Sequence, residues 1–154
     1  GQESICNGIM ELAKHYGETD LISIHDAIRP MVSAHIISEN LAVCRQYGGA
    51  ITAISCAEAM FFTEDKSAST QAVDRDKLMR TQTPQCYPLG KLVWAHQEAK
   101  KRGITNSVAT CTLMCELGET IHFSAGSERN VNLTTQDDLD IFRALLTNDR
   151  RMGQ

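Results

Sequence analysis

The spacing of apolar residues alternates along the chain between two patterns, which predict strands and helices in turn. Residues 21–24 and 50–55 are short apolar runs rich in β-branched side chains, a composition typical of buried strands. Residues 34–47 carry apolar side chains at helical spacing and stop at Gly48-Gly49, which predicts a helix with a glycine end. A strand, a helix and a strand in this order favour an α/β fold with a parallel sheet.

Further elements follow from the same two periodicities. A polar tip at 64–67 predicts a β-hairpin carrying Phe61 and Phe62, and an exposed apolar pair of this kind favours packing against a second copy of the chain. Thr135 is expected to cap a last helix, whose inward-facing apolar residues would be Leu139, Phe142, Leu145 and Leu146. The remaining predicted elements are helices at 3–16, 88–102 and 107–117 and short strands at 120–124 and 131–134.

The composition is that of an ordinary soluble globular protein. The 154 residues are 42% hydrophobic and 22% charged, which suits one domain over 1–154. The formal net charge of −4 argues against a nucleic-acid partner, and no apolar run approaches the roughly 18 residues of a membrane span. With no signal peptide at the start, we expect a cytoplasmic protein. The six cysteines form no Cys-x-x-Cys pair, so we expect reduced thiols and no structural zinc site.

The candidate chemistry lies where the first predicted strand ends. The apolar run at 21–24 stops at His25, and Asp26 and Arg29 follow. Because ligands of open α/β sheets bind outside the carboxyl ends of strands, Asp26 could hold a metal ion and Arg29 a phosphate or carboxylate. A salt bridge that only closes the loop explains the same pair equally well. Thr83, biased to an extended conformation by Pro84, could present its hydroxyl to a ligand or belong to a structural loop.

The order of several short motifs is more specific than any one of them. The sequence contains His25-Asp26-Ala27-x-Arg29-Pro30, then Gln82-Thr83-Pro84-Gln85, then Gly126-Ser127-x-x-Asn130-x-x-x-Thr134 followed by Asp138-Leu139. Together with the opening Glu3-Ser4-Ile5-x-Asn7-Gly8, this order resembles the 2-C-methyl-D-erythritol 4-phosphate cytidylyltransferase family and the related ribitol-5-phosphate cytidylyltransferases. The resemblance covers nearly the whole chain.

The resemblance implies a CTP-dependent enzyme with the Rossmann-like nucleotide-diphospho-sugar transferase fold. Such an enzyme joins CMP to the phosphate of a small polyol phosphate, uses Mg²⁺ and releases pyrophosphate. The first acceptor that it suggests is 2-C-methyl-D-erythritol 4-phosphate, an intermediate of isoprenoid biosynthesis; ribitol 5-phosphate, another polyol phosphate or a phosphonate is the alternative. The hairpin at 57–75 is expected to be an arm that reaches across a homodimer.

The resemblance also implies roles for individual residues. Asp26 would bind Mg²⁺, and Arg29 would be a charge clamp in the substrate pocket. The residues that would contact CTP are Ser4, at its cytosine end, Asp26 and Ala27. The residues that would bind or surround the acceptor are Arg29, Arg75, Thr83, Thr105, Asn132 and Thr134, with Arg75 and Thr105 acting in the neighbouring subunit's site.

Several departures from the family pattern bear on activity. Family members carry a glycine-rich loop that cradles the CTP triphosphate before the point where this chain starts, so the sequence looks like the carboxyl-terminal two thirds of such an enzyme. Asn132 stands where the family has a lysine, which removes a positive charge from the pocket, and Ala59 and Asn106 also differ. A non-catalytic relative that serves in dimerisation therefore stays open as an alternative, as does a sugar nucleotidyltransferase that uses UTP.

Overall fold

The protein is an α/β structure built on one mixed sheet. The computed structural model describes residues 1–152, with side chains described for 1–148. The helices are α1 (Gln2–Leu12), α2 (Ala34–Tyr47), α3 (Leu89–Arg102), α4 (Thr110–Glu116) and α5 (Gln136–Met152), with the short 3₁₀ helix η1 (Arg75–Lys77). The strands are β1 (Leu21–Ile24), β2 (Ala50–Ser55), β3 (Met60–Phe62), β4 (Gln71–Val73), β5 (Met79–Pro88) and β6 (Phe123–Ala125).

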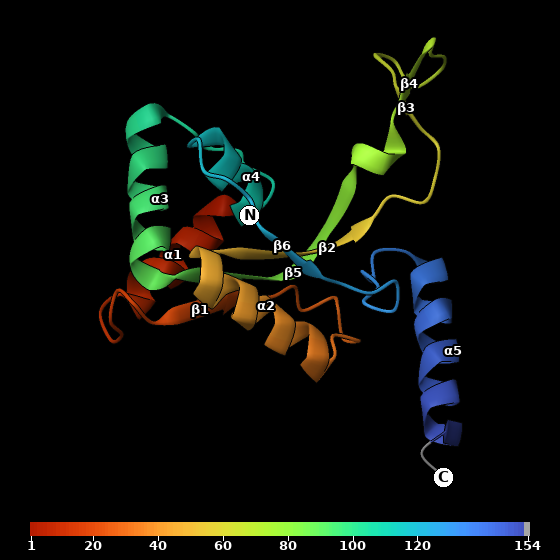
Figure 1. Cartoon of the computed structure of the whole chain (residues 1–154), viewed down its shortest axis with the longest axis horizontal. Helices are drawn as coiled ribbons and strands as arrows, with labels where there is room; N and C mark the ends of the chain where they lie inside the picture. Colours follow the sequence, from red (N-terminus) through yellow and green to blue (C-terminus); the bar gives the residue numbers. More distant parts are fainter. Residues whose placement is uncertain (153–154) are drawn as a thin grey trace.

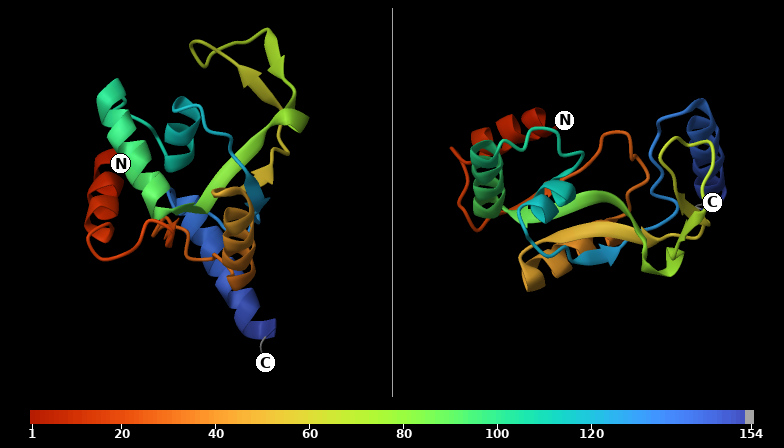
Figure 2. Two further views of the ribbon diagram at one scale, coloured as in Figure 1. Left: turned by 60° about the vertical axis from the view of Figure 1, so that its left-hand side comes forward. Right: turned by 90° about the horizontal axis from the view of Figure 1, so that it is seen from above.

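The elements form three layers around a four-stranded sheet of order β1-β5-β2-β6. Helices α1, α3 and α4 cover one face of the sheet, and α2 covers the other (Figures 1 and 2). The larger core lies on the side of α3 and α4, and its most buried large side chains are Ile51, Tyr87, Leu89, Leu92, Leu113 and Met114. A smaller cluster under α2 contains Cys44, Ala50 and Cys86. This layering confirms the predicted α/β class.

The directions of the strands differ from the prediction. The expected strand, helix and strand are present as β1, α2 and β2, but β5 lies between the two strands and runs antiparallel to both. The parallel pair is β2 with β6. The placement of 21–24 in a parallel sheet is therefore wrong for the described residues. Within them β1 pairs with β5 alone, and its side chains are half-buried or exposed, whereas β2 is buried along most of its length.

The central strand β5 is the element that sequence reasoning missed. It contains Pro84, which cannot donate to a strand ladder, and the polar residues Gln82, Thr83 and Gln85, so it does not read as a buried strand. The register with β2 shifts between Ile51 and Ala53, which places the proline at an irregularity of the ladder. All three polar side chains are buried and hydrogen-bonded, which removes the penalty for their burial.

Helix ends follow the glycine signals closely. α2 spans the predicted residues and α3 begins one residue after Pro88; both end at a glycine with positive φ, Gly48 at 75° and Gly103 at 70°. α1 stops at Leu12, four residues before the predicted end. α4 begins at Thr110 rather than at 107. The described helices include none that is both long and apolar enough to span a membrane.

Two elements extend beyond the sheet (Figure 1). The antiparallel pair β3–β4 forms the predicted hairpin, which we call the arm, residues 57–75. The predicted helix after Thr135 is present as α5, but none of its described side chains is fully buried, so the prediction that its apolar residues face the core is wrong. The strand expected at 131–134 is also wrong, because this segment is a loop tied to the rest by the bond from Leu133 N to Ile28 O, 2.8 Å long.

Candidate active site

The segment that follows β1 is anchored to β5 by hydrogen bonds. Register pairing of Ile24 with Gln85 brings the end of β1 beside Thr83. The backbone N–H of Asp26 donates to Thr83 Oγ1 over 3.0 Å, and the same oxygen lies 2.9 Å from His25 Nδ1. His25 Nε2 lies 3.0 Å from the carbonyl oxygen of Arg29. These bonds fold the loop back on itself, so that Asp26 and Arg29 lie on the same side of it.

Asp26 and Arg29 have different environments. The Arg29 side chain is only 12% exposed and donates from Nη1 to the carbonyl oxygen of Asn130 over 2.7 Å. The Asp26 side chain is 48% exposed, and its Oδ2 accepts a longer bond of 3.4 Å from Arg29 Nε. Arg29 is thus held by a neighbouring loop, while the Asp26 carboxylate is open to a ligand.

The loop after β6 is fixed against β5 by Gln82 and Asn130. The Nδ2 of fully buried Asn130 donates to Thr83 O over 2.8 Å and to Gln82 Oε1 over 3.3 Å, and Gln82 Nε2 donates to Ser127 O over 2.9 Å. A Cβ at Gly126 would lie 2.5 Å from Gln82 Oε1 and 3.1 Å from Ala53 O, so a side chain here would displace the buried Gln82 amide from its bonds. The second and third sequence motifs therefore pack on one another.

A cavity of about 340 Å³ opens between these segments. Its lining includes two cations and two carboxylates, Arg29, Arg80, Glu128 and Asp138, together with Asn130 and Asn132. Arg80 forms a short ion pair with Glu128. Arg29 has only the longer contact of 3.4 Å with Asp26, so its positive charge is less well neutralised. The amide oxygens of Asn130 and Asn132 are buried and accept no hydrogen bond from any described residue.

Asp138 is committed to the start of α5. Its Oδ2 accepts from Thr134 N, Thr134 Oγ1 and Thr135 N over 2.9, 3.0 and 2.7 Å. These bonds, first of all the one from the Thr134 backbone N–H, lower the pKa of the carboxyl from 3.8 to about 2. In return Asp138 N donates to Thr135 Oγ1, so the predicted cap at Thr135 is confirmed.

The structure brings some of the predicted site residues together and leaves others apart. Asp26, Arg29 and Thr83 are joined by hydrogen bonds, and Asn132 lines the same cavity as Arg29. Thr134 lies at the edge of that group through Asp138, and Ala27 is exposed in the loop after β1. Three predicted residues lie on other elements, with no hydrogen bond to this group among the described residues: Ser4 in α1, Arg75 in η1 and Thr105 between α3 and α4.

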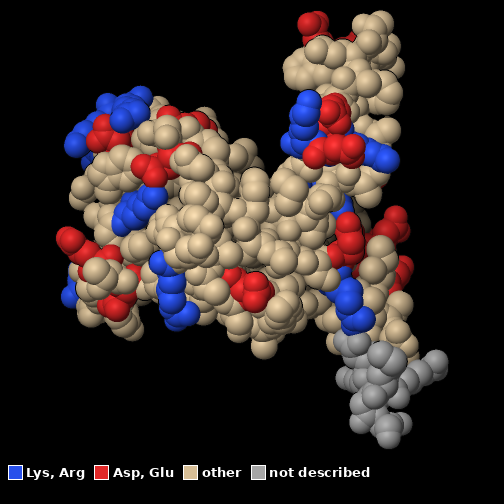
Figure 3. Space-filling model, in the orientation of Figure 1, with Lys and Arg blue, Asp and Glu red and all other residues tan. Residues whose placement is uncertain are grey.

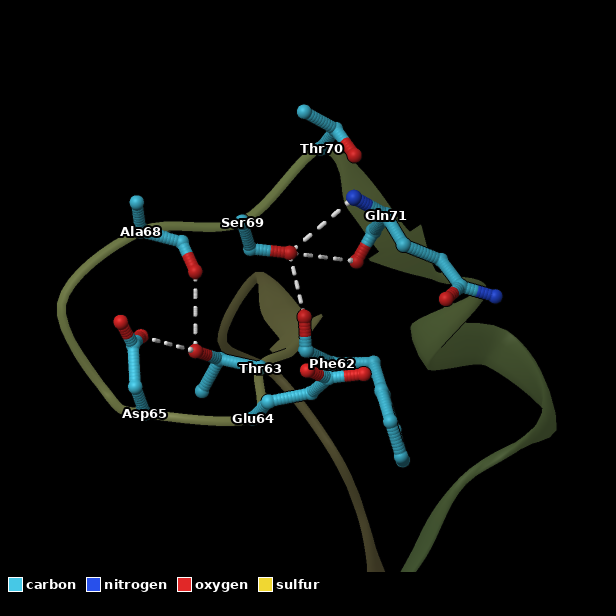
Figure 4. Close-up of a pocket in the computed structure, with 8 residues that line it drawn as sticks. All are labelled: Phe62, Thr63, Glu64, Asp65, Ala68, Ser69, Thr70 and Gln71. Atoms are coloured by element: carbon cyan, nitrogen blue, oxygen red, sulfur yellow. Dashed lines mark hydrogen bonds between the residues drawn. The ribbon is translucent and has the colours of Figure 1, made fainter.

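Arg75 lies at the base of the arm. Its Nη1 donates to Ala57 O over 2.6 Å, which closes the segment 57–75 at its root. A larger cavity of about 420 Å³ lies at the arm tip (Figure 4), but its lining hydroxyls bond within the tip, Thr63 Oγ1 to Ala68 O and Ser69 Oγ to Phe62 O. Of its two carboxylates, Glu64 and Asp65, the second also bonds within the tip, to Ser67, so this cavity is a consequence of the turn.

The residues present fit a magnesium ion that is shared with a substrate. The described residues contain no cluster of three or more metal-binding side chains, which excludes a metal cage made by this chain's described part alone. Mg²⁺ is commonly held by one or two carboxylates with substrate phosphates and water, and the exposed Asp26 carboxylate suits that mode. In Figure 3 acidic and basic side chains are interspersed, with no continuous basic area on the face shown.

The sequence pointed to Asp26, Arg29 and Thr83, but it did not predict the supporting bonds of His25, Gln82, Asn130 and Asp138. Each of the four acts by bonding to another part of the chain that is distant in sequence or by closing a turn. Their positions inside the quoted motifs were the one signal available, because hydrogen-bond partners up to 101 residues away cannot be derived from spacing.

Comparison with known proteins decides the family. Residues 1–148 match the model of the 2-C-methyl-D-erythritol 4-phosphate cytidylyltransferase (IspD) family. The chain belongs to this family. The match confirms the resemblance that the ordered motifs carried, and it places the chain among the nucleotidyltransferases.

Individual relatives agree with this family. A ribitol-5-phosphate cytidylyltransferase of Lacticaseibacillus paracasei is 40% identical over 94% of this chain and 63% of its own length. A 2-C-methyl-D-erythritol 4-phosphate cytidylyltransferase of Clostridium acetobutylicum is 32% identical over 94% of the chain and 61% of its own length. The chain therefore spans less than two thirds of the length of these relatives.

Solved structures share the fold. A 4-diphosphocytidyl-2C-methyl-D-erythritol synthase has a TM-score of 0.81 at 27% identity, covering 94% of this chain and 66% of that one. The 2-C-methyl-D-erythritol 4-phosphate cytidylyltransferase of Thermus thermophilus has a TM-score of 0.82 at 23% identity, covering 95% and 69%. The second likeness concerns the fold alone.

Proposed function

We propose that the protein transfers CMP from CTP to the phosphate of an acyclic polyol phosphate, with ribitol 5-phosphate as the acceptor, and releases pyrophosphate. The observation that carries this proposal is the pairing of an open carboxylate, Asp26, with a held cation, Arg29, beside a cavity of about 340 Å³ in a chain of the cytidylyltransferase family. A carboxylate and a guanidinium at the end of a strand suit a metal-bound triphosphate and a second phosphate.

Sequence identity supports ribitol 5-phosphate over methylerythritol phosphate. The first acceptor suggested by the motifs was methylerythritol phosphate, yet the L. paracasei ribitol enzyme is 40% identical and the C. acetobutylicum methylerythritol enzyme 32%. The family model bears the methylerythritol name, which keeps that acceptor as the second candidate. Both acceptors are polyol phosphates of similar size, so the same reaction applies to either.

The reaction needs little covalent chemistry from the protein. An oxygen of the acceptor phosphate attacks the α-phosphorus of CTP, one P–O bond forms, and the bond to the bridging oxygen of the departing pyrophosphate breaks. Mg²⁺ on Asp26 would supply charge neutralisation for the phosphates. Arg29, positioned by Asn130, would reduce the repulsion between the two phosphates, while Thr83, Asn132 and Thr134 would surround the acceptor and Ser4 and Ala27 the nucleotide.

The arm supports a homodimer. Phe61 and Phe62 are 58% and 64% exposed, and Met60 is 43% exposed, so the arm presents an apolar surface that the described part of the chain does not cover. We propose that this surface binds a second copy, and that Arg75 at the root of the arm and Thr105 reach the acceptor site of that copy. The residues 1–154 then form one domain with a dimerisation arm.

Pyrophosphate release tests the proposal. The full gene product is assayed with CTP and Mg²⁺ plus ribitol 5-phosphate, methylerythritol phosphate or no acceptor. We expect release with both acceptors and a higher kcat/KM for ribitol 5-phosphate. Arg29→Ala should lower kcat/KM by at least about tenfold, since a charge-assisted hydrogen bond contributes roughly 1.5–3 kcal/mol. Removal of Mg²⁺ with a chelator should abolish release.

Arg102→Ala is the matched control, because Arg102 pairs with Glu98 at the end of α3. This variant should retain the activity of the wild type. If no acceptor gives pyrophosphate, the protein is not a cytidylyltransferase for these substrates. If Arg29→Ala mainly lowers the melting temperature and leaves activity per folded molecule intact, the Asp26–Arg29 pair only closes the loop.

A further inference from the structure

Four residues of the site close a ring of hydrogen bonds, which we call the site ring: His25, Arg29, Thr83 and Asn130. Thr83 Oγ1 lies 2.9 Å from His25 Nδ1, and His25 Nε2 lies 3.0 Å from Arg29 O. Arg29 Nη1 donates to Asn130 O over 2.7 Å, and Asn130 Nδ2 donates to Thr83 O over 2.8 Å. The ring joins β5, the loop after β1 and the loop after β6, which are the segments that carry Asp26, Arg29 and Asn132.

The partners of His25 select one tautomer of its neutral ring. The carbonyl oxygen of Arg29 can only accept, so the hydrogen lies on Nε2. In the neutral imidazole Nδ1 is then an acceptor, and the Thr83 hydroxyl donates to it. Thr83 Oγ1 in turn accepts from the backbone N–H of Asp26. In the neutral imidazole every hydrogen bond at Thr83 and His25 therefore has one donor and one acceptor, with the Thr83 hydroxyl directed at Nδ1.

We propose that His25 is a positioning residue of the transferase reaction, and that it sets the separation of the Asp26 carboxylate and the Arg29 guanidinium through the site ring. The inference rests on the proposed function. His25 reaches Asp26 through Thr83 and reaches Arg29 through the Arg29 carbonyl, so its imidazole spans the loop on which both charged residues lie. It need not contact the substrate, because in-line transfer between phosphates depends on where the two charges stand.

Two substitutions of His25 distinguish the contributions of its two ring nitrogens. His25→Ala removes both contacts and should lower kcat by about tenfold to hundredfold, which corresponds to losing one or two hydrogen bonds that orient the site. His25→Gln, which retains a donor near the Nε2 position, should recover part of the lost kcat. In either variant, KM for CTP should change by less than about threefold. The control is His15→Ala, since His15 contacts Glu11 at the end of α1, and it should match the wild type.

A double-mutant cycle tests whether His25 acts through Thr83. Thr83→Val keeps the shape of the side chain and removes the hydroxyl, and Thr83→Ser keeps the hydroxyl. In the Thr83→Val background, His25→Ala should cause at most about a threefold further loss, whereas independent residues would multiply their effects. Multiplying effects, or a His25→Ala variant within about twofold of the wild-type kcat, would overturn the proposal. A variant that only melts earlier, with activity per folded molecule unchanged, would overturn it as well.

A spectroscopic measurement separates this inference from the function itself. Long-range ¹H–¹⁵N spectra of the full gene product, assigned with His25→Asn, should show the His25 ring as the Nε2–H tautomer in the wild type and in Thr83→Ser. In Thr83→Val the ring should become a mixture of tautomers, because Nδ1 loses its donor. If the wild-type ring is already a mixture, the site ring does not hold His25 and the inference fails, even where pyrophosphate is released. If no acceptor supports pyrophosphate release but His25 has a single tautomer, the proposed function is wrong. The site ring then exists without a role in a transferase reaction, and the proposed positioning role of His25 is wrong as well.

Discussion

Two buried amide oxygens distinguish the cavity beside Arg29 at the scale of single residues. Asn130 donates from Nδ2 to two acceptors, which identifies the other side-chain atom as the oxygen. This Asn130 oxygen and Asn132 Oδ1 accept no hydrogen bond from any described residue. An unpaired buried acceptor loses about 1–3 kcal/mol of hydration. A polyol brings hydroxyl donors that can satisfy these oxygens, whereas a fully ionised phosphate brings none. The cavity chemistry therefore favours the polyol part of an acceptor at this position.

Replacing Asn132 tests whether the missing charge sets the affinity for the acceptor. Asn132→Lys adds a cation to a cavity that contains Arg29, and we expect KM for the polyol phosphate to fall by about tenfold, less at high salt, because the gain is electrostatic. Asn132→Met is the size-matched neutral control, and its KM should rise by a few fold through loss of the amide oxygen. Steady-state kinetics at two ionic strengths measures both. Equal KM values for the two variants would rule out charge as the cause.

At the scale of elements, the start of α5 depends on one carboxylate. Asp138 accepts three hydrogen bonds there, and its pKa is lowered to about 2 from 3.8. A lowered carboxyl pKa contributes stability that is present above the ordinary value and is lost as the pH falls toward the folded value. The amide protons of Thr134 and Thr135, followed by NMR during acid titration, should therefore shift with a midpoint near pH 2.

Asp138→Asn and Asp137→Asn form the matched pair for this titration. Both residues lie in the first turn of α5, but only Asp138 bonds to the preceding backbone N–H groups among the described contacts. Asp138→Asn should abolish the low-pH shift of the two amides, and Asp137→Asn should leave it in place. A midpoint near 3.8 in the wild type would mean that the carboxylate does not hold the cap in solution.

The sequence predicted elements well where local signals were strong. α2 and β2 have the predicted bounds because periodicity, β-branched composition and the stop at Gly48 agree. β5 was missed because its buried polar residues are stabilised by partners far along the chain, and β1 was misjudged because its orientation depends on β5. At the site, the charged pair Asp26 and Arg29 was readable from the motif, whereas the supporting bonds of Gln82 and Asn130 were not.

The arm exposes two adjacent phenylalanines, which we expect to join two copies of the chain. Successive strand residues point to opposite faces, so Phe61 and Phe62 expose apolar surface on both sides of β3. Changing both to Ser should convert the proposed dimer to a monomer, as measured by sedimentation velocity, and should lower activity in parallel. Tyr16→Ser is the control, because Tyr16 has the same 58% exposure as Phe61 but lies after α1. A dimer that survives the double substitution would show that another surface joins the subunits.

At the scale of the whole molecule, the residues of the proposed site fall into two groups. Arg29 and Asn132 line one cavity, and hydrogen bonds join Asp26 to Arg29 and to Thr83 beside it. Arg75, in contrast, closes the root of an arm that projects away from the sheet (Figure 1). In the proposed dimer the arm carries Arg75 to the cavity of the other subunit. An arrangement of this kind makes each site depend on both copies of the chain, and dimerisation then becomes a condition for activity.

Mixing two inactive variants decides whether Arg75 serves its own site or that of its partner. Asp26→Asn and Arg75→Ala homodimers of the full gene product are each expected to be inactive. After random exchange about half of the dimers are mixed, and each mixed dimer has one site with both an intact Asp26 and an intact Arg75 from the other subunit. Pyrophosphate release should therefore recover to about one quarter of the wild-type rate. If Arg75 acts within its own chain, every site in the mixture lacks one of the two residues, and no activity returns.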